Sequence, residues 1–241
     1  MYGSTAIVIV VIIIVVLGIK LFYTAPTCFD GKMNGNEQGP DCGGACEKLC
    51  PSAFLLPIVN WTRFERIAPH LYNMAAYIVN PNIDGGAFRV PYHVQLYDGR
   101  GVLITEYDGT VTLPPHRNIL AFEGAVDIQE RVPAKALFEF TGAPNWIKTN
   151  DSLTSLLVVD KQYFEDENGS SLIVTLKNTS VEMLGKTSVY AVLYDKDSNA
   201  LGFSKTIIDG INAGATAVAP FTWPINRQGA VISIEVLPVA E

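Results

Sequence analysis

The chain has 241 residues, of which 49% are hydrophobic and 17% are charged, so it is too apolar for a disordered protein. This length accommodates a membrane anchor together with one or two domains of about 100–150 residues. The formal net charge of −7 argues against binding to a nucleic-acid backbone. Three histidines, His70, His93 and His116, leave little material for a histidine-based catalytic or metal site.

The chain begins with a long apolar run. No charged residue occurs from Tyr2 to Ile19, and after Lys20 the run continues to Tyr23. A helix of this length spans about 30 Å, the thickness of the hydrocarbon core of a bilayer. Within lipid, only a helix satisfies all the backbone hydrogen bonds of a single segment. We therefore predict a transmembrane helix over residues 2–23; a buried strand is the alternative, but strands are rarely this long.

The flanks of the run favour a retained anchor over a cleaved signal peptide. No Lys or Arg precedes it, and Pro26 follows where a cleavage site would lie. Lys20, taken alone, would place the C-terminal side in the cytoplasm. The four cysteines that follow indicate an oxidising compartment instead. We predict a single-pass protein of the cell membrane whose C-terminal bulk is extracytoplasmic.

All four cysteines lie in a segment of 23 residues: Cys28, Cys42, Cys46 and Cys50. The segment is rich in glycine and too short for a hydrophobic core, so crosslinks must hold it together. Two disulfides are the simplest solution, and three pairings remain open. A zinc ion bound by four thiolates is the alternative, although the paired C-x2-C spacing typical of such sites is missing. We predict a disulfide-stapled stalk over residues 28–50.

The same segment contains five side chains that offer oxygen atoms: Asp30, Asn34, Asn36, Glu37 and Asp41. Calcium binds about six to eight oxygens, and glycines allow a short loop to wrap around one ion. These residues are therefore candidate Ca²⁺ ligands, and Ca²⁺ is the only cofactor that the sequence suggests. In the alternative interpretation, Asp and Asn only accept hydrogen bonds from the backbone of a polar turn.

The pattern C-x-D-G-x-x-N-G-x-E-x-G-x-D-C-G-G-x-C in this segment resembles a recurring module of prokaryotic cell-surface proteins. The resemblance covers about a tenth of the chain. It implies an extracytoplasmic spacer or an adhesion context and carries no reaction with it.

From residue 53 on, short apolar runs alternate with turn signals such as Asn80-Pro81-Asn82, and no stretch keeps a helical period for a dozen residues. This pattern predicts an all-β fold. The runs also recur: Leu96-Tyr97-Asp98 returns 97 residues later as Leu193-Tyr194-Asp195, and Asn80 parallels Asn178. The offset is the size of one immunoglobulin-like domain. We predict two tandem immunoglobulin-like β-sandwiches, over residues 52–147 and 152–238.

The second copy resembles the FxLYD-type domain, an immunoglobulin-like β-sandwich of bacterial and archaeal envelope proteins. The resemblance rests on Leu193-Tyr194-Asp195, Leu201-Gly202 and Pro220-Phe221-Thr222-Trp223, whereas Ala191 stands in place of the leading Phe of the family. It implies a binding or scaffolding module without catalytic residues.

No catalytic motif is visible, since the nucleophile elbow G-x-S-x-G, the P-loop and the dinucleotide fingerprint are all missing. Glu106 with Asp108, or the acidic residues 165–167, could form a glycosidase pair, but both sets lie in predicted hairpin turns, where acids usually serve as turn formers. The run 165–167 with Asp160 could also hold a second calcium ion. We expect no enzymatic activity, no small-molecule substrate and no nucleic-acid partner.

These features together predict a membrane-anchored extracytoplasmic binding or scaffold protein of the cell envelope. Its partner would be another envelope or surface protein, which the sequence does not identify. The alternative is a subunit of a pilus-like or secretion-associated surface filament, with the apolar helix packed in the filament core.

Overall fold

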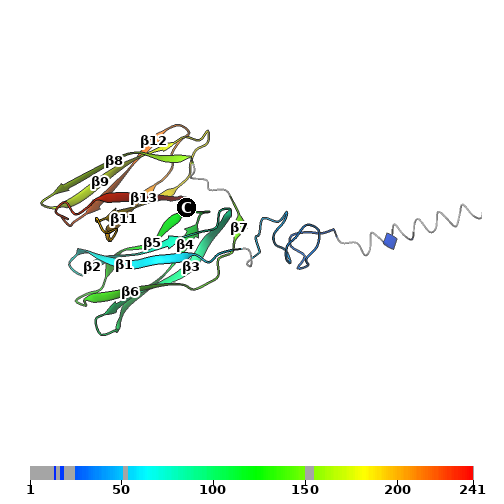
Figure 1. Cartoon of the computed structure of the whole chain (residues 1–241), viewed down its shortest axis with the longest axis horizontal. Helices are drawn as coiled ribbons and strands as arrows, with labels where there is room; N and C mark the ends of the chain where they lie inside the picture. The colour runs from blue at the N-terminus through cyan, green and yellow to red at the C-terminus, as the bar shows by residue number, and fades with distance from the viewer. Residues whose placement is uncertain (1–13, 15–16, 19–24, 51–53, 150–154, 241) are drawn as a thin grey trace, which may run out of the picture. The chain divides into compact units, whose positions relative to one another are not determined.

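The computed structural model describes residues 14, 17–18, 25–50, 54–149 and 155–240 (Figure 1). The chain forms two units, residues 1–50 and 51–241. Most of the predicted transmembrane segment, residues 2–23, lies outside the described residues. Within the described part, no helix combines the length and the apolar character that crossing a membrane requires.

The second unit confirms the predicted all-β class, with thirteen strands in its described residues. The first seven strands form a first module: β1 (Ile58–Ala68), β2 (Leu71–Val79), β3 (Gly85–Asp98), β4 (Leu103–Leu113), β5 (Asn118–Asp127), β6 (Pro133–Phe140) and β7 (Ile147–Lys148). The other six form a second module: β8 (Leu156–Asp166), β9 (Gly169–Asn178), β10 (Thr187–Tyr194), β11 (Ala200–Ile208), β12 (Thr216–Trp223) and β13 (Ser233–Ala240).

Each module contains two antiparallel sheets. The first module has sheets β1-β2-β5 and β4-β3-β6, with β7 paired to β3, and the second has β8-β9-β12 and β11-β10-β13. If β1 is matched with β8, β2 with β9, and so on to β6 with β13, the order of these six strands is the same in both modules, and only the short β7 on β3 lacks a counterpart. The repeat in the sequence is therefore a repeat of topology.

A buried asparagine occupies the same place in both modules. Asn80 Nδ2 donates to the carbonyl oxygens of Gly85 and Pro114, each at 2.8 Å, and Asn178 Nδ2 donates in the same way to three carbonyl oxygens of its own module. Neither side chain has any exposed surface. Each asparagine thus ties the end of one strand to neighbouring segments of its module, whose carbonyl groups would otherwise be buried without a partner.

The aspartate of each Leu-Tyr-Asp run closes a turn of the same form. Asp98 Oδ1 accepts hydrogen bonds from the backbone N–H groups of Arg100 and Val102, both at 2.9 Å. Asp195 Oδ1 accepts from the N–H groups two and four residues on, at 2.9 and 2.8 Å. These bonds let the aspartate side chain act as a local template for the hairpin.

The two modules share a hydrophobic cluster. In a sheet with one covered face, buried and exposed residues alternate, but residues 73–78 of β2 and 187–189 and 191–193 of β10 are all buried. One face of each strand packs on its own module and the other on the neighbouring module. The buried members of the shared cluster are Ala75, Tyr77, Leu120, Val192, Phe203 and Leu237. Sheet β1-β2-β5 therefore packs against sheet β11-β10-β13.

Candidate functional site

Two disulfides hold the cysteine segment, Cys28–Cys46 and Cys42–Cys50. This is one of the three pairings that the sequence left open. It engages all four cysteines, so the thiolates that a zinc site would need are not present. The glycine at position 44 is required by the fold of the loop, because a Cβ there would lie 1.6 Å from the Asn36 carbonyl oxygen.

The candidate calcium ligands of this segment bond mostly to the segment itself. The Asp41 carboxylate accepts hydrogen bonds from the N–H groups of Asp30, at 2.7 Å, and Gly31, at 2.8 Å. Asp30 accepts from Asn34 Nδ2 at 2.9 Å, and Glu37 accepts from the Asn34 N–H at 3.0 Å. Hydrogen bonds of this kind are what the alternative interpretation predicts, in which Asp and Asn only stabilise a polar turn.

One buried oxygen of these candidate ligands lacks such a bond. Asn34 Oδ1 is buried and has no hydrogen-bond partner among the described residues. The side chain of Asn36 is exposed. A calcium site here stays a prediction. To bind the ion, the carboxylates of Asp30 and Asp41 would have to give up the hydrogen bonds that they accept within the segment.

A buried ion pair joins the two modules. Glu65 on β1 pairs with Arg227, which lies in the loop between β12 and β13, and their side chains are only 7% and 6% exposed. Glu65 also accepts a hydrogen bond from the Phe203 N–H at 3.1 Å. Burial raises the pKa of Glu65, and the attraction of the guanidinium opposes that rise. Gly202 lies against the pair, since a Cβ there would overlap the Arg227 guanidinium.

A second polar cluster crosses the same interface. Glu235 on β13 accepts hydrogen bonds from the hydroxyls of Tyr77, at 2.9 Å, and Tyr194, at 3.1 Å. Burial, reinforced by the nearby Glu235 carboxylate, raises the pKa of both tyrosines, so both hydroxyls stay protonated and donate. Sequence patterns could not reveal these interface residues, because Glu65 and Arg227 are separated by 162 positions.

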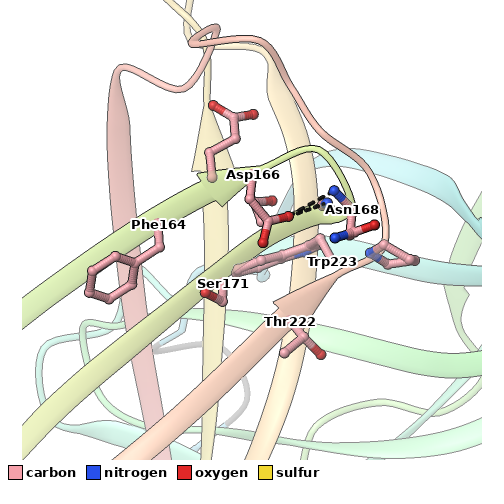
Figure 2. Close-up of a pocket in the computed structure, with 10 residues that line it drawn as sticks. Phe164, Asp166, Asn168, Ser171, Thr222 and Trp223 are labelled. Carbon is pink, nitrogen blue, oxygen red and sulfur yellow. Dashed lines mark hydrogen bonds between the residues drawn. The ribbon is translucent and has the colours of Figure 1, made fainter.

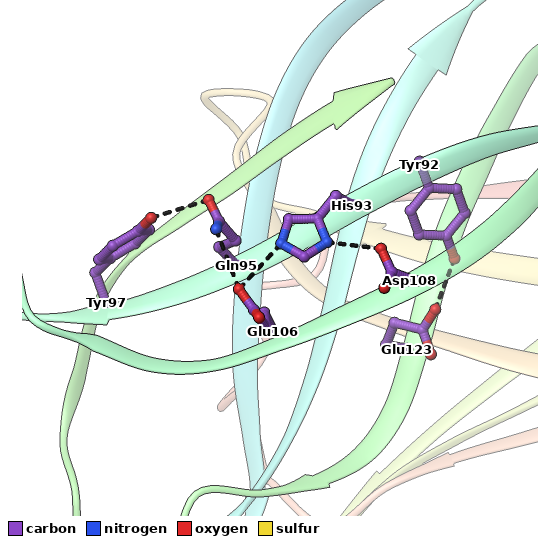
Figure 3. A network of polar contacts seen from close by, with 7 residues as sticks. All are labelled: Tyr92, His93, Gln95, Tyr97, Glu106, Asp108 and Glu123. Atoms are coloured by element: carbon purple, nitrogen blue, oxygen red, sulfur yellow. Dashed lines mark hydrogen bonds and ion pairs between the residues drawn. The ribbon is translucent and has the colours of Figure 1, made fainter. Parts of the chain in front are cut away.

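Figure 3 shows a polar network on the other sheet of the first module. His93 Nδ1 lies 2.8 Å from Asp108 Oδ1, and His93 Nε2 lies 3.2 Å from Glu106 Oε2. The hydrogen bond with Asp108, followed by the one with Glu106, raises the pKa of His93. The two acids are well exposed, so the network faces solvent.

The position of these acids corrects one prediction. Glu106 and Asp108 were expected in a hairpin turn, because Asp108-Gly109 is a typical turn pair, yet both lie inside β4. Gly109 is paired with Tyr92 across the strands, and a Cβ at 109 would lie 2.4 Å from the Tyr92 ring. The glycine therefore makes room for an aromatic ring, a role that a local sequence pattern does not distinguish from a turn.

A cavity of about 470 Å³ lies at one end of the second module, between the β8–β9 hairpin and the end of β12 (Figure 2). Asp166 accepts hydrogen bonds from the N–H groups of Asn168 and Gly169, at 2.8 and 3.1 Å, and Glu165 accepts from the Gly229 N–H at 2.9 Å. These two acids are therefore turn formers, as predicted. Trp223 is 2% exposed, and its Nε1 has no hydrogen-bond partner among the described residues.

No protein-family model matches the chain, and no curated protein matches it. Among solved structures it is similar to a β-glucuronidase of Bacteroides uniformis, with 12% identity and a TM-score of 0.20 over 72% of this chain and 22% of that one. It is also similar to a β-glucuronidase from glycoside hydrolase family 2, with 11% identity and a TM-score of 0.23 over 91% of this chain and 29% of that one.

A further match is Bacteroides uniformis β-glucuronidase 2, with 14% identity and a TM-score of 0.22. The chain spans less than a third of the length of each of these three enzymes. Likenesses this slight indicate neither a shared fold nor a shared activity.

Proposed function

We propose that the protein is a membrane-anchored extracytoplasmic binding or scaffold protein of the cell envelope. Residues 2–23 cross the membrane once, residues 28–50 form the stalk, and the two modules are immunoglobulin-like domains that contact another envelope protein. The proposal rests mainly on one observation. Two disulfides crosslink residues 28–50, a segment too short for a hydrophobic core that directly follows the apolar run. Such bonds form and persist in oxidising compartments.

Binding, in preference to catalysis, is supported by the way four of the described acids are used. Asp166 and Glu165 bond to turns, and Glu65 and Glu235 bond across the module interface. The shared hydrophobic cluster also holds the two modules together, so that they present fixed surfaces.

The surface best suited to a partner is the outer face of sheet β4-β3-β6. Asp108 and Glu139 flank His93 on the two neighbouring strands, and Glu106 lies one row further along. A rigid sheet that presents three carboxylates favours a partner with a basic surface, because complementary charge steers the encounter of two proteins.

Labelling of intact cells that express the full chain tests the topology. A membrane-impermeant thiol reagent should label the cysteines on unbroken cells, and it should do so only after mild reduction of the disulfides. A cytoplasmic thiol protein in the same cells provides the control. Labelling that appears only after lysis would place the stalk in the cytosol and would refute the proposal.

Crosslinking on the same cells tests the binding surface. The variant Glu106→Gln/Asp108→Asn should lower the yield of a specific crosslinked partner several-fold, whereas Glu182→Gln, a substitution on the second module, should not. Equal yields from both variants would exclude this face as the contact. Helical filaments of the full-length protein in micrographs would support the filament subunit instead.

A further inference from the structure

A second cavity, of about 300 Å³, lies between the two modules, beside their shared hydrophobic cluster. Strands β3, β4 and β5 of the first module form one wall, and β10, β11 and β13 of the second form the other. Small-molecule sites occur preferentially between domains and have volumes from about 300 Å³ upward. The cavity is therefore large enough for a molecule of monosaccharide size.

Arg89 lines this cavity from an unusual backbone position. The pairing of β3 with β4 is interrupted between Ala87 and Val90, and Arg89 lies in that bulge with a φ of 52°. A positive φ is unfavourable for arginine, and bulges often serve to redirect a side chain at a functional site. No hydrogen bond or ion pair within the described part of the chain engages the Arg89 guanidinium.

The opposite wall contributes a second cation. Lys205 on β11 pairs across the strands with Tyr190 on β10, and its Nζ lies 5.5 Å from the centre of the Tyr190 ring. Each module thus supplies one positive side chain to a partly enclosed space. An anion between the two walls would be stabilised by both charges more strongly than in bulk water.

Aromatic rings and hydroxyl groups complete the lining. The aromatic residues are Tyr92, Phe122 and Tyr190, and the small hydroxyl residues are Thr110, Thr112 and Ser188. The Tyr92 hydroxyl donates to Glu123 at 2.7 Å, which fixes that ring in the wall (Figure 3). Rings offer a flat apolar contact to the face of a sugar, and hydroxyls can bond to its hydroxyl groups.

We propose that this cavity binds a sugar acid of monosaccharide size, such as a hexuronic acid. Arg89 and Lys205 hold the carboxylate, the aromatic wall contacts the ring face, and the threonine and serine hydroxyls bond to the sugar hydroxyls. Arginine suits this role because its planar guanidinium can bond both oxygens of a carboxylate. The inference goes beyond the envelope role and does not depend on membrane attachment or on a protein partner.

Calorimetric titration of the full chain with three probes tests the ligand class. D-Galacturonate should bind, and D-galactose, which lacks the carboxylate, should bind at least about tenfold more weakly. Inorganic phosphate, which lacks the ring, should also bind at least about tenfold more weakly. Equal binding of galactose would overturn the anionic site, equal binding of phosphate would overturn the sugar site, and no binding of galacturonate would overturn both.

Variants then test the location. Arg89→Gln should weaken galacturonate binding about tenfold or more, and Arg89→Lys should weaken it less, because the charge remains while the two-point hydrogen bonding is lost. Arg100→Gln, in the turn between β3 and β4, is the matched control and should bind like the wild type. The melting temperature of each variant without ligand verifies that it is folded. Unchanged binding in Arg89→Gln would refute the proposed site, and so would an equal loss in Arg100→Gln.

Discussion

Asp98 shows how a single residue sets the end of a strand. The backbone N–H of Val102 and the side chain of Arg131, at 2.9 Å, stabilise its charged form and hold the pKa of this carboxyl at about 2. Asp195 accepts hydrogen bonds from backbone N–H groups at the equivalent positions. Its pKa is also lowered, and the largest cause is the hydrogen bond from the N–H of Asn199. The Leu-Tyr-Asp runs therefore recur because the aspartate builds the turn with its ionised side chain.

This geometry predicts a specific pH dependence for Asp98. Since the folded pKa lies below that of the unfolded chain, about 3.9, the stabilisation is complete above that value and is lost as the pH falls towards 2. Between pH 4 and pH 2, the melting temperature of the wild type should fall more steeply than that of Asp98→Asn. Asp84→Asn, a change at an exposed aspartate, should keep the wild-type slope. Parallel curves for the wild type and Asp98→Asn would contradict the prediction.

The two buried asparagines give a second prediction at this scale. Asn80→Ala and Asn178→Ala each leave several buried carbonyl groups without a donor, which should cost about 1–3 kcal/mol of unfolding free energy. Urea denaturation measures the loss. Asn168→Ala, in the exposed β8–β9 turn, should change the free energy by less than about 0.5 kcal/mol. A similar small effect in all three variants would show that water takes over the role of the buried amide.

At the scale of strands and sheets, the repeat explains what could be predicted from the sequence. Asn80 and Asp98 recur in the second module because they bond within their own module. The faces of the sheets diverge, however: Gln95 and Glu106, paired across β3 and β4, stand where Val192 and Phe203 pair across β10 and β11. The first pair faces solvent and the second faces the other module.

The packing between modules could not be predicted for a related reason. Burial on both faces removes the alternation that identifies which side of a strand is covered, and β2 and β10 become nearly continuous apolar runs. The polar residues that cross the interface, such as Glu65, find their partners only in the folded chain. The cavity at Arg89 escaped prediction because its lining comes from six strands.

The ion pair between β1 and the β12–β13 loop gives an element-scale prediction. Arg227→Met leaves Glu65 buried without its cation, which should cost about 3–5 kcal/mol near pH 7. The loss should shrink in acid, because the isolated carboxyl, already raised in pKa by burial, can be buried in its protonated form. Urea denaturation at pH 7 and pH 4 measures both effects.

Arg131→Met provides the control for this prediction, since that side chain is 39% exposed and solvent screens its pair with Asp98, so the loss should be much smaller than in Arg227→Met. The double variant Glu65→Met/Arg227→Met should lose less than Arg227→Met alone, because no buried charge remains. A loss in Arg227→Met that is small and independent of pH would show that water reaches Glu65.

At the scale of the whole molecule, the shared cluster joins two repeats into one cooperative body. Phe203 is 1% exposed in a cluster with residues of the first module, so neither module can unfold without exposing apolar surface on the other. Calorimetry of the full chain should therefore show a single transition for the two modules, with equal calorimetric and van't Hoff enthalpies.

The variant Phe203→Glu tests this cooperativity. It places at position 203 the residue type found at the equivalent, solvent-facing position of the first module, Glu106. Burying that charge should separate the modules and split the transition in two, whereas Phe164→Glu, at a 52% exposed position, should leave one transition. Two transitions in the wild type would mean that the modules fold independently and that the interface contributes little to their stability.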